Sequence, residues 1–121
     1  MGVPLTEKIE DCVGVGDAIG VISNKWTIFV IIALYSHSLR FNEIKRQVKG
    51  ISHQMLARTL KELTSNGLVE RSVLDTNPPM VEYNLSELGY SLADALKPLA
   101  VWAKKNQEKI SIKRYELGNE S

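Results

Sequence analysis

The sequence has few of the residues that crosslink a chain, bind metal or cross a membrane. A single cysteine among its 121 residues rules out an intramolecular disulfide, and the two histidines, His37 and His53, are not at a zinc-binding spacing. The longest apolar run, residues 28–34, is much shorter than the roughly 18 residues that span a bilayer. The N-terminus also lacks the basic and apolar segments of a secretion signal. We therefore expect no metal site and no membrane span, and we place the protein in a reducing cytoplasm.

Residue combinations typical of catalysis are missing as well. Neither histidine has a carboxylate at helical spacing on a plausible shared face, and the chain contains no nucleophile elbow and no phosphate-binding loop. The sequence thus predicts no catalytic residues and no cofactor, which makes an enzyme the disfavoured class.

The charges nearly cancel but are unevenly placed. The net charge is only +1, yet between Arg40 and Lys61 six basic side chains accompany a single acid, Glu43. Residues 1–20 have the opposite bias, with four acids against Lys8. A balanced total can hide such asymmetry, so we expect the two regions to present opposite potentials and to attract different partners.

Hydrophobic periodicity predicts two short helices joined by a tight turn over about residues 41–66. Asn42 is a suitable N-cap for the first helix, and Gly50 is suited to end it. Ser52 is a suitable N-cap for the second helix, which Gly67 ends. The second helix has one apolar stripe, formed by Leu56, Leu60 and Leu63. Two helices in this order are typical of a helix-turn-helix unit.

Helix and hairpin patterns flank this unit. Residues 25–36 are apolar on nearly all sides, which predicts a fully buried central helix, and the many β-branched residues leave a strand as the alternative. Two strand-like segments within about residues 68–85, separated by a turn that contains paired prolines, predict a β-hairpin. From about residue 86 to 110 the pattern is helical again, and Pro98 interrupts it. The expected fold class is therefore mainly α with a small β-hairpin (α+β).

Several segments resemble those of a known protein family, both in their residues and in their order along the chain. They are Ile22-Ser-Asn-Lys-Trp26, Arg40-Phe-Asn-Glu-Ile44, Gly50-Ile-Ser52, Leu63-Thr-Ser-Asn-Gly-Leu-Val-Glu-Arg71 and Pro78-Pro-Met-Val-Glu-Tyr83-Asn-Leu-Ser-Glu-Leu-Gly89, followed by Trp102. On these residues the chain resembles the HxlR family of winged helix-turn-helix transcriptional regulators, which are MarR-like. Because the segments occur in one collinear order over most of the chain, the resemblance is more specific than any single motif.

The resemblance implies a single winged-helix domain over residues 1–121, with dimerisation helices at both termini. Members of the family are homodimeric repressors or activators of prokaryotes. The resemblance implies that helix 52–66 of each subunit lies in a major groove of a palindromic operator of double-stranded DNA. The residues implied at the dimer interface are Leu5, Ile9, Leu92, Ala95, Leu99 and Trp102.

The outward face of helix 52–66 has side chains suited to DNA. Opposite the leucine stripe lie His53, Gln54, Ala57, Arg58 and Lys61, with Ser52 at the helix start. Gln and Arg read adenine and guanine through paired hydrogen bonds, a small Ala allows close approach, and Lys and Ser contact phosphates. The residues expected at the DNA backbone are Lys25, Arg40, Lys45, Arg46 and Lys49. A merely solvated helix face is the competing interpretation.

The hairpin loop departs from the family pattern. Where many relatives have a basic residue after the paired prolines, this chain has Met80, and Asp75 adds a negative charge. The hairpin tip is therefore a poor partner for the minor groove, whose walls are phosphates. The candidate contacts of the wing are Arg71, Thr76 and Asn77.

Cys12 is a candidate redox sensor. Some members of the family sense oxidants through a cysteine ahead of the first core helix, and Cys12 lies near that place. Its acidic sequence neighbours disfavour the thiolate that such chemistry needs. The alternative is a small apolar residue in the dimer interface. The effector implied is thus an oxidant or an unknown small molecule.

A winged helix that binds another protein and does not read DNA is the alternative function. Leu92, Ala95, Leu99 and Trp102 would then hold a different protein instead of a second copy. The salt dependence of binding distinguishes the two functions, because neutralising phosphates makes affinity fall steeply with salt.

Overall fold

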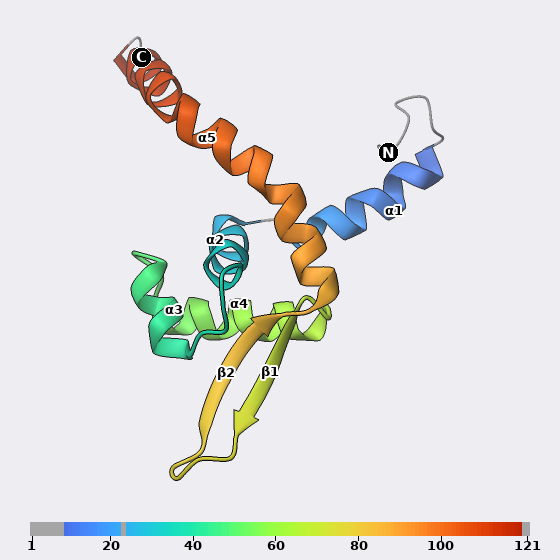
Figure 1. Cartoon of the computed structure of the whole chain (residues 1–121). Helices are drawn as coiled ribbons and strands as arrows, with labels where there is room; N and C mark the ends of the chain where they lie inside the picture. Colours follow the sequence, from blue (N-terminus) through green and yellow to red (C-terminus); the bar gives the residue numbers. More distant parts are fainter. Residues whose placement is uncertain (1–8, 23, 120–121) are drawn as a thin grey trace.

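The computed structural model describes residues 9–22 and 24–119, and the side chains of residues 14–22 and 24–118. The elements in chain order are α1 (Ile9–Gly20), α2 (Lys25–Leu34), α3 (Phe41–Gln47), α4 (His53–Ser65), β1 (Val69–Leu74), β2 (Met80–Leu85) and α5 (Glu87–Asn119). Figure 1 shows α3, α4 and the β1–β2 hairpin at one end, which we call the packed end. At the other end, the open end, α1 and the C-terminal half of α5 diverge from each other.

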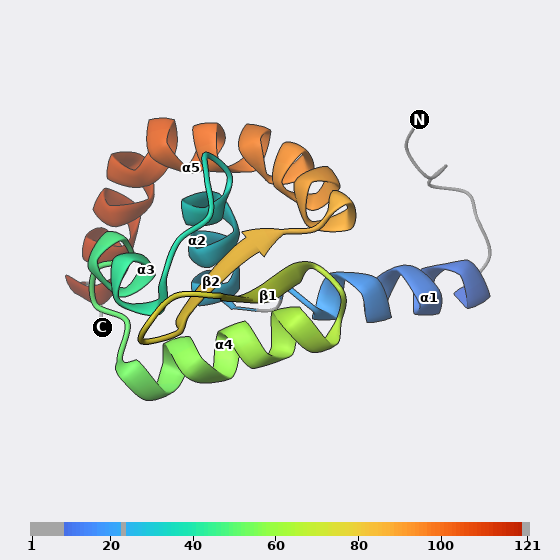
Figure 2. The same ribbon diagram turned by 60° about the horizontal axis from the view of Figure 1, so that its bottom comes forward.

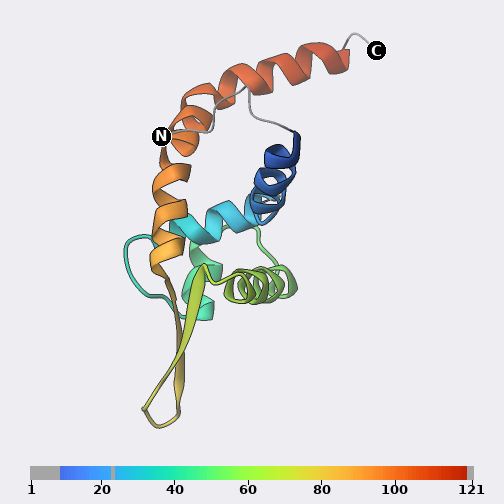
Figure 3. The same ribbon diagram turned by 90° about the vertical axis from the view of Figure 1, so that its right-hand side faces the viewer.

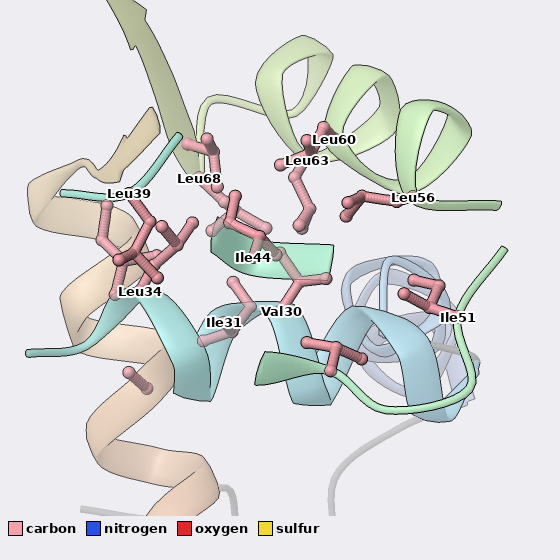
Figure 4. Packing of buried hydrophobic residues seen from close by; sticks show 14 of the residues in the cluster. Val30, Ile31, Leu34, Leu39, Ile44, Ile51, Leu56, Leu60, Leu63 and Leu68 are labelled. Atoms are coloured by element: carbon pink, nitrogen blue, oxygen red, sulfur yellow. The ribbon is translucent and has the colours of Figure 1, made fainter. Parts of the chain in front are cut away.

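The hydrophobic core lies between α2, α3 and α4. Figure 4 shows its side chains converging from these helices and from the segments between them. The labelled members, all nearly inaccessible to solvent, are Val30, Ile31, Leu34, Leu39, Ile44, Ile51, Leu56, Leu60, Leu63 and Leu68. Burying one side chain of this size contributes roughly 1.5–3 kcal/mol. The three leucines of α4 therefore fix which face of that helix points inward.

The turn between α3 and α4 has the chemistry expected from the sequence. Gly50 has φ of 89°, a left-handed conformation that favours glycine. The Ser52 hydroxyl accepts a hydrogen bond of 3.1 Å from the Met55 N–H and caps α4. Gly67, with φ of 74°, follows the end of α4. The helix-turn-helix thus lies where the periodicity placed it.

The hairpin forms the wing. Its two strands pair antiparallel, from Val69 opposite Leu85 to Leu74 opposite Met80. Leu39 joins the sheet by a single bridge, in which its N–H and that of Tyr83 donate to each other's carbonyl oxygens at 3.0 and 2.8 Å. The expected fold class, mainly α with a small β-hairpin in a winged helix-turn-helix, is confirmed.

Glycine is required where α5 leaves the hairpin. A Cβ atom at Gly89 would collide with the backbone carbonyl oxygen of Leu68. The Ser86 hydroxyl accepts a hydrogen bond of 3.0 Å from the Gly89 N–H and donates one of 2.6 Å to the Gly67 carbonyl oxygen. The first turn of α5 is therefore held closely against the start of β1.

Two helices differ from the sequence-based expectation. The helix over residues 25–36 was expected to be buried on all sides, but in α2 Phe29 and Ile32 are 45% and 40% exposed. Neighbouring elements cover Val30, Ile31 and Leu34 and leave one strip of the helix open. In α3 the N-cap is Arg40 and not Asn42, because Glu43 accepts a hydrogen bond of 2.8 Å from the Arg40 N–H.

The last helix is longer than the expected span of about 86–110. It contains Pro98 and continues to Asn119. The added segment has a Lys113–Glu116 ion pair of 3.7 Å, at a spacing that stabilises helices. From Lys97 onward no described side chain of α5 is fully buried, so this half of the helix lies outside the core.

The described ranges contain no single helix that is long and apolar enough to cross a membrane. Residues 14–20 and 25–34 reach that length and composition only when taken together, across a 72° bend.

Candidate nucleic-acid interface

α4 presents its polar face to solvent. The helix runs along the lower edge of the molecule in Figure 2, beside the hairpin. Because the leucines are buried, the opposite face of α4 points to solvent. All the residues of this face that were expected to contact DNA are exposed, namely Ser52, His53, Gln54, Ala57, Arg58 and Lys61. A helix of 13 residues with a free polar face is of a size that the major groove admits.

Arg58 is held by an acid that the sequence analysis did not single out. Its Nε lies 3.2 Å from Oε1 of Glu62, one helical turn further along α4. The two side chains are 74% and 52% exposed, so the pair is worth little in water and can open. The spacing of four residues was visible in the sequence and could have identified Glu62.

His53 packs against α3 rather than standing free. The centroid of its ring is 4.7 Å from that of Phe41, with the two rings tilted by 46°. This contact joins the first residues of α3 and α4. It restrains the orientation in which the imidazole meets any partner.

Arg40 links the start of α3 to the wing. Its Nε is 3.3 Å from the Glu43 carboxylate, and Nη1 is 3.6 Å from Sδ of Met80. The Arg40 backbone N–H, as a hydrogen-bond donor, holds the pKa of the Glu43 carboxyl below its ordinary value, and the guanidiniums of Arg40 and Arg46 act in the same direction. The carboxylate that caps α3 is therefore favoured in its charged form.

The other expected backbone cations surround the same end of the molecule. Lys45 and Arg46 lie in the last turn of α3 and Lys49 follows it, all exposed. Lys25 opens α2, and its Nζ lies 4.7 Å from the centroid of the Trp26 ring. The structure thus gathers these charges around the helix-turn-helix.

The tip of the wing offers few free donors. The Thr76 hydroxyl donates a hydrogen bond of 2.8 Å to the Pro78 carbonyl oxygen and is used inside the loop. Asn77 is exposed beside it, and Asp75 is the charged residue of the tip. Arg71 lies farther back on β1, opposite Tyr83 of β2.

Tyr83 is a residue near the interface that sequence reasoning missed. It lines a cavity between α4 and the hairpin together with Lys61 and Arg71. Its position depends on the strand register, which the sequence alone does not determine.

The residues expected at the dimer interface fall into three groups. Leu5 lies outside the described residues, and the side chains of Ile9 and Cys12, both in α1, are outside the described side chains. Leu92 is half-buried and packs on the core of its own subunit. The exposed members, all on α5, are Ala95, Leu99 and Trp102.

The exposed groups of the packed end offer positive charge and hydrogen-bond donors. These are the groups that bind phosphates and base edges. In the two ranges that the structure describes, no group of three or more His, Cys, Asp or Glu side chains is placed to hold a metal ion.

Comparison with known proteins finds relatives over most of the chain. The HxlR-like helix-turn-helix family matches residues 21–111. An uncharacterised HTH-type transcriptional regulator of Methanothermobacter thermautotrophicus is 44% identical over 87 residues, which are 72% of this chain and 66% of that protein. Among solved structures, the reduced transcriptional regulator YodB of Bacillus subtilis is 36% identical with a TM-score of 0.67, over 74% of this chain and 88% of that one. The reduced form of the redox regulator HypR is 32% identical with a TM-score of 0.74, over 81% and 97% of the two chains.

Proposed function

Because the chain belongs to the HxlR-like helix-turn-helix family, we propose that it is a DNA-binding transcriptional regulator that binds a palindromic operator as a homodimer. In this proposal α4 of each subunit enters a major groove, and the two α4 helices lie about 34 Å apart, which is one turn of duplex. The matched relatives are named as transcriptional regulators and not as enzymes, which supports the same class of function.

The exposed polar face of α4 is the observation that carries the proposal. Gln54 and Arg58 have the groups that read base edges, and Ala57 lets the helix approach closely. Arg58 exchanges Glu62 for a base when the complex forms, because the exposed ion pair is weak. Ser52, His53 and Lys61 complete the face on the phosphate side.

Residues around α4 orient the protein on the duplex. Phosphate contacts set orientation without reading sequence, and exposed cations at the ends of α2 and α3 suit that task. The residues that we assign to it are Lys25, Arg40, Lys45, Arg46 and Lys49. At the wing the assigned contacts are Arg71, Thr76 and Asn77.

The open end supports a second copy of the chain as partner. Leu99 and Trp102 of α5 are 50% and 55% exposed. A mostly apolar cavity of about 520 Å³ lies between α2 and α5, with Phe29, Ile32 and Leu99 among its lining residues. Covering apolar surface is favourable by roughly 25 cal/mol per Å², and exposed patches of this kind mark interaction sites. We assign this surface, with Leu5, Ile9, Leu92 and Ala95, to the dimer interface.

Selection from random duplex DNA tests the proposal. The purified protein is expected to enrich a palindrome with two half-sites one helical turn apart, and its affinity is expected to fall steeply between two salt concentrations. A protein that enriches no sequence, reduced or oxidised, would contradict DNA readout. That outcome would favour the protein-binding alternative through the same α5 surface.

We further propose an oxidant or small-molecule effector that acts at Cys12. The structural similarity to HypR, a redox regulator, favours this second element. Cys12 is the only cysteine of the chain, so a disulfide would join two subunits or a subunit and a small thiol. Its place in α1, at the open end, is where such a change would alter the dimer.

Operator affinity before and after treatment with diamide tests the sensor. The wild-type protein is expected to change its affinity, and to regain it on reduction, whereas Cys12→Ser is expected to be unaffected. A Cys12→Ser protein that responds like the wild type would remove the sensor role.

A further inference from the structure

A groove between α4 and the base of the hairpin has positive charge on both of its walls. The cavity has a volume of about 300 Å³, and α4 contributes Lys61 and Ser65 while the hairpin contributes Arg71 and Tyr83. Figure 3 shows α4 nearly end-on beside the start of the hairpin. Among the residues that the structure describes, no Asp or Glu lines this groove.

The strand register segregates the charges of the hairpin. Arg71 is paired with Tyr83, and side chains alternate between the two faces of a strand, so these two share the face toward α4. Glu70 and Glu82 occupy positions of the other parity and lie on the opposite face. There Asn84 Nδ2 donates to the Glu70 carboxylate at 3.5 Å. The hairpin thus presents its cation to α4 and keeps both of its strand carboxylates away.

Lys61 and Arg71 lack the internal acidic partners that Arg58 and Arg40 have. Arg58 is bonded to Glu62 and Arg40 to Glu43, but neither Lys61 nor Arg71 forms a hydrogen bond or ion pair with any described residue. Two like charges that line one groove repel each other, and an anion bound between them offsets this repulsion. The half-buried Tyr83 also has no described partner for its hydroxyl.

We propose that this groove binds one phosphate of the DNA backbone, held jointly by Lys61 and Arg71 with the Tyr83 hydroxyl as a further donor. The inference rests on the proposed function, because α4 in a major groove brings the flanking backbone alongside the helix. The charged contact of the wing with DNA then lies at its base, where Arg71 is, because Asp75 at the tip would repel a phosphate. Such a contact adds affinity and salt dependence without reading sequence.

The first test compares Arg71→Ala with the wild type on the selected operator and on random duplex over a range of salt. For each lost contact we expect affinity about threefold to tenfold lower on both DNAs and a salt slope smaller by about 0.9, hence by about 1.8 for the dimer, which loses one contact in each subunit. Arg71→Lys retains a positive charge and is expected to keep most of the slope. Ser72→Ala, on the opposite face of β1, and Lys105→Ala, which removes one charge at the open end, are expected to bind like the wild type.

The second test locates the phosphate. Neutral methylphosphonate linkages are placed one at a time along each strand of the operator. At one linkage per half-site, neutralisation is expected to weaken the wild type about threefold to tenfold but to weaken Arg71→Ala clearly less, because one of the two cations that hold this phosphate is already lost. Tyr83→Phe is expected to weaken binding less than Arg71→Ala.

The outcomes separate this inference from the function on which it rests. If the wild type enriches no DNA, the proposed function fails. If the wild type binds its operator but Arg71→Ala has the same affinity, salt slope and linkage profile, only the groove contact is overturned. Thermal unfolding of each variant shows that a loss of binding is not a loss of fold, and the exposed position of Arg71 leads us to expect unchanged stability.

Discussion

α4 and α5 both have apolar side chains at helical spacing, but α4 buries its leucine stripe inside its own chain, whereas α5 leaves its large apolar side chains from Leu99 onward exposed. Leu56, Leu60 and Leu63 of α4 are at most 3% exposed. Beyond Pro98 in α5, Leu99, Trp102 and Leu117 are 50% or more exposed. The same sequence pattern therefore has two structural meanings. The stripe of α4 completes the core of its own subunit, and the stripe of α5 remains free to contact another protein surface.

The faces that the two helices leave free are opposite in chemistry. α4 exposes amide, imidazole and cationic groups, which suit a polyanion. α5 exposes apolar side chains, which suit another protein surface. In our proposal the molecule binds DNA at one end and its second copy at the other, so each end can be disabled separately.

A core substitution in α4 should have the largest effect. Leu56→Ala leaves a cavity at a fully buried site and is expected to lower the free energy of unfolding by about 2–5 kcal/mol. The same change at Leu117, which is 66% exposed, is expected to alter intrinsic stability by less than about 0.5 kcal/mol. Urea unfolding at two protein concentrations measures both and separates folding from association. Equal losses in the two variants would abolish the contrast between the helices.

Removing the largest exposed ring of α5 should act on association. Trp102→Ala is expected to weaken the dimer by about 2–4 kcal/mol, because tryptophans at the centre of interfaces contribute most to binding. Sedimentation equilibrium measures the dissociation constant, and circular dichroism is expected to show an unchanged fold. Lys109→Ala on the same helix is the control. An unchanged dissociation constant in Trp102→Ala would place the interface elsewhere.

Substitutions on the outer face of α4 should act on DNA alone. Arg58→Ala is expected to cost about 1–3 kcal/mol on the operator and to relax preference at one position of each half-site. Lys61→Ala is expected to weaken binding to all sequences equally and to lower the salt slope by about one for each subunit of the dimer. Competition between the operator and single-base variants measures both. Unchanged binding in both variants would show that α4 is not the recognition helix.

The sequence predicted the parts of the fold that local chemistry determines. Gly50 and Ser52 mark the turn between α3 and α4 because left-handed backbone and an N-cap each favour few residue types. The leucine stripe of α4 is buried as predicted. The hairpin follows from two β-rich segments around paired prolines.

Features that depend on packing or pairing were not accessible in this way. Phe29 and Ile32 are exposed because of where the neighbouring helices lie. The sequence does not show this, because the helix is apolar on nearly all sides and its hydrophobic pattern does not mark the exposed one. The length of α5 was underestimated because its last turns have no apolar stripe facing the core. At the candidate site, the residues of α4 were placed correctly on one face, but the pairing of Tyr83 with Arg71 needed the strand register.

The smallest effect is expected from the charge of Glu43 at the start of α3. It tests whether this carboxylate stabilises the N-terminus of the helix. Donation from the Arg40 N–H holds the pKa of the Glu43 carboxyl below its ordinary value. Because this pKa is lower in the folded protein, the charged carboxylate adds stability that is complete above the ordinary pKa. That stability is lost as the pH falls below the ordinary pKa and through the lower folded value. Glu43→Gln keeps an acceptor for the N–H but cannot ionise. The wild type should therefore have a higher urea midpoint than Glu43→Gln, and this difference should shrink as the pH falls below the ordinary pKa of the carboxyl. A difference that stays constant would mean that the charge of Glu43 contributes nothing to the cap.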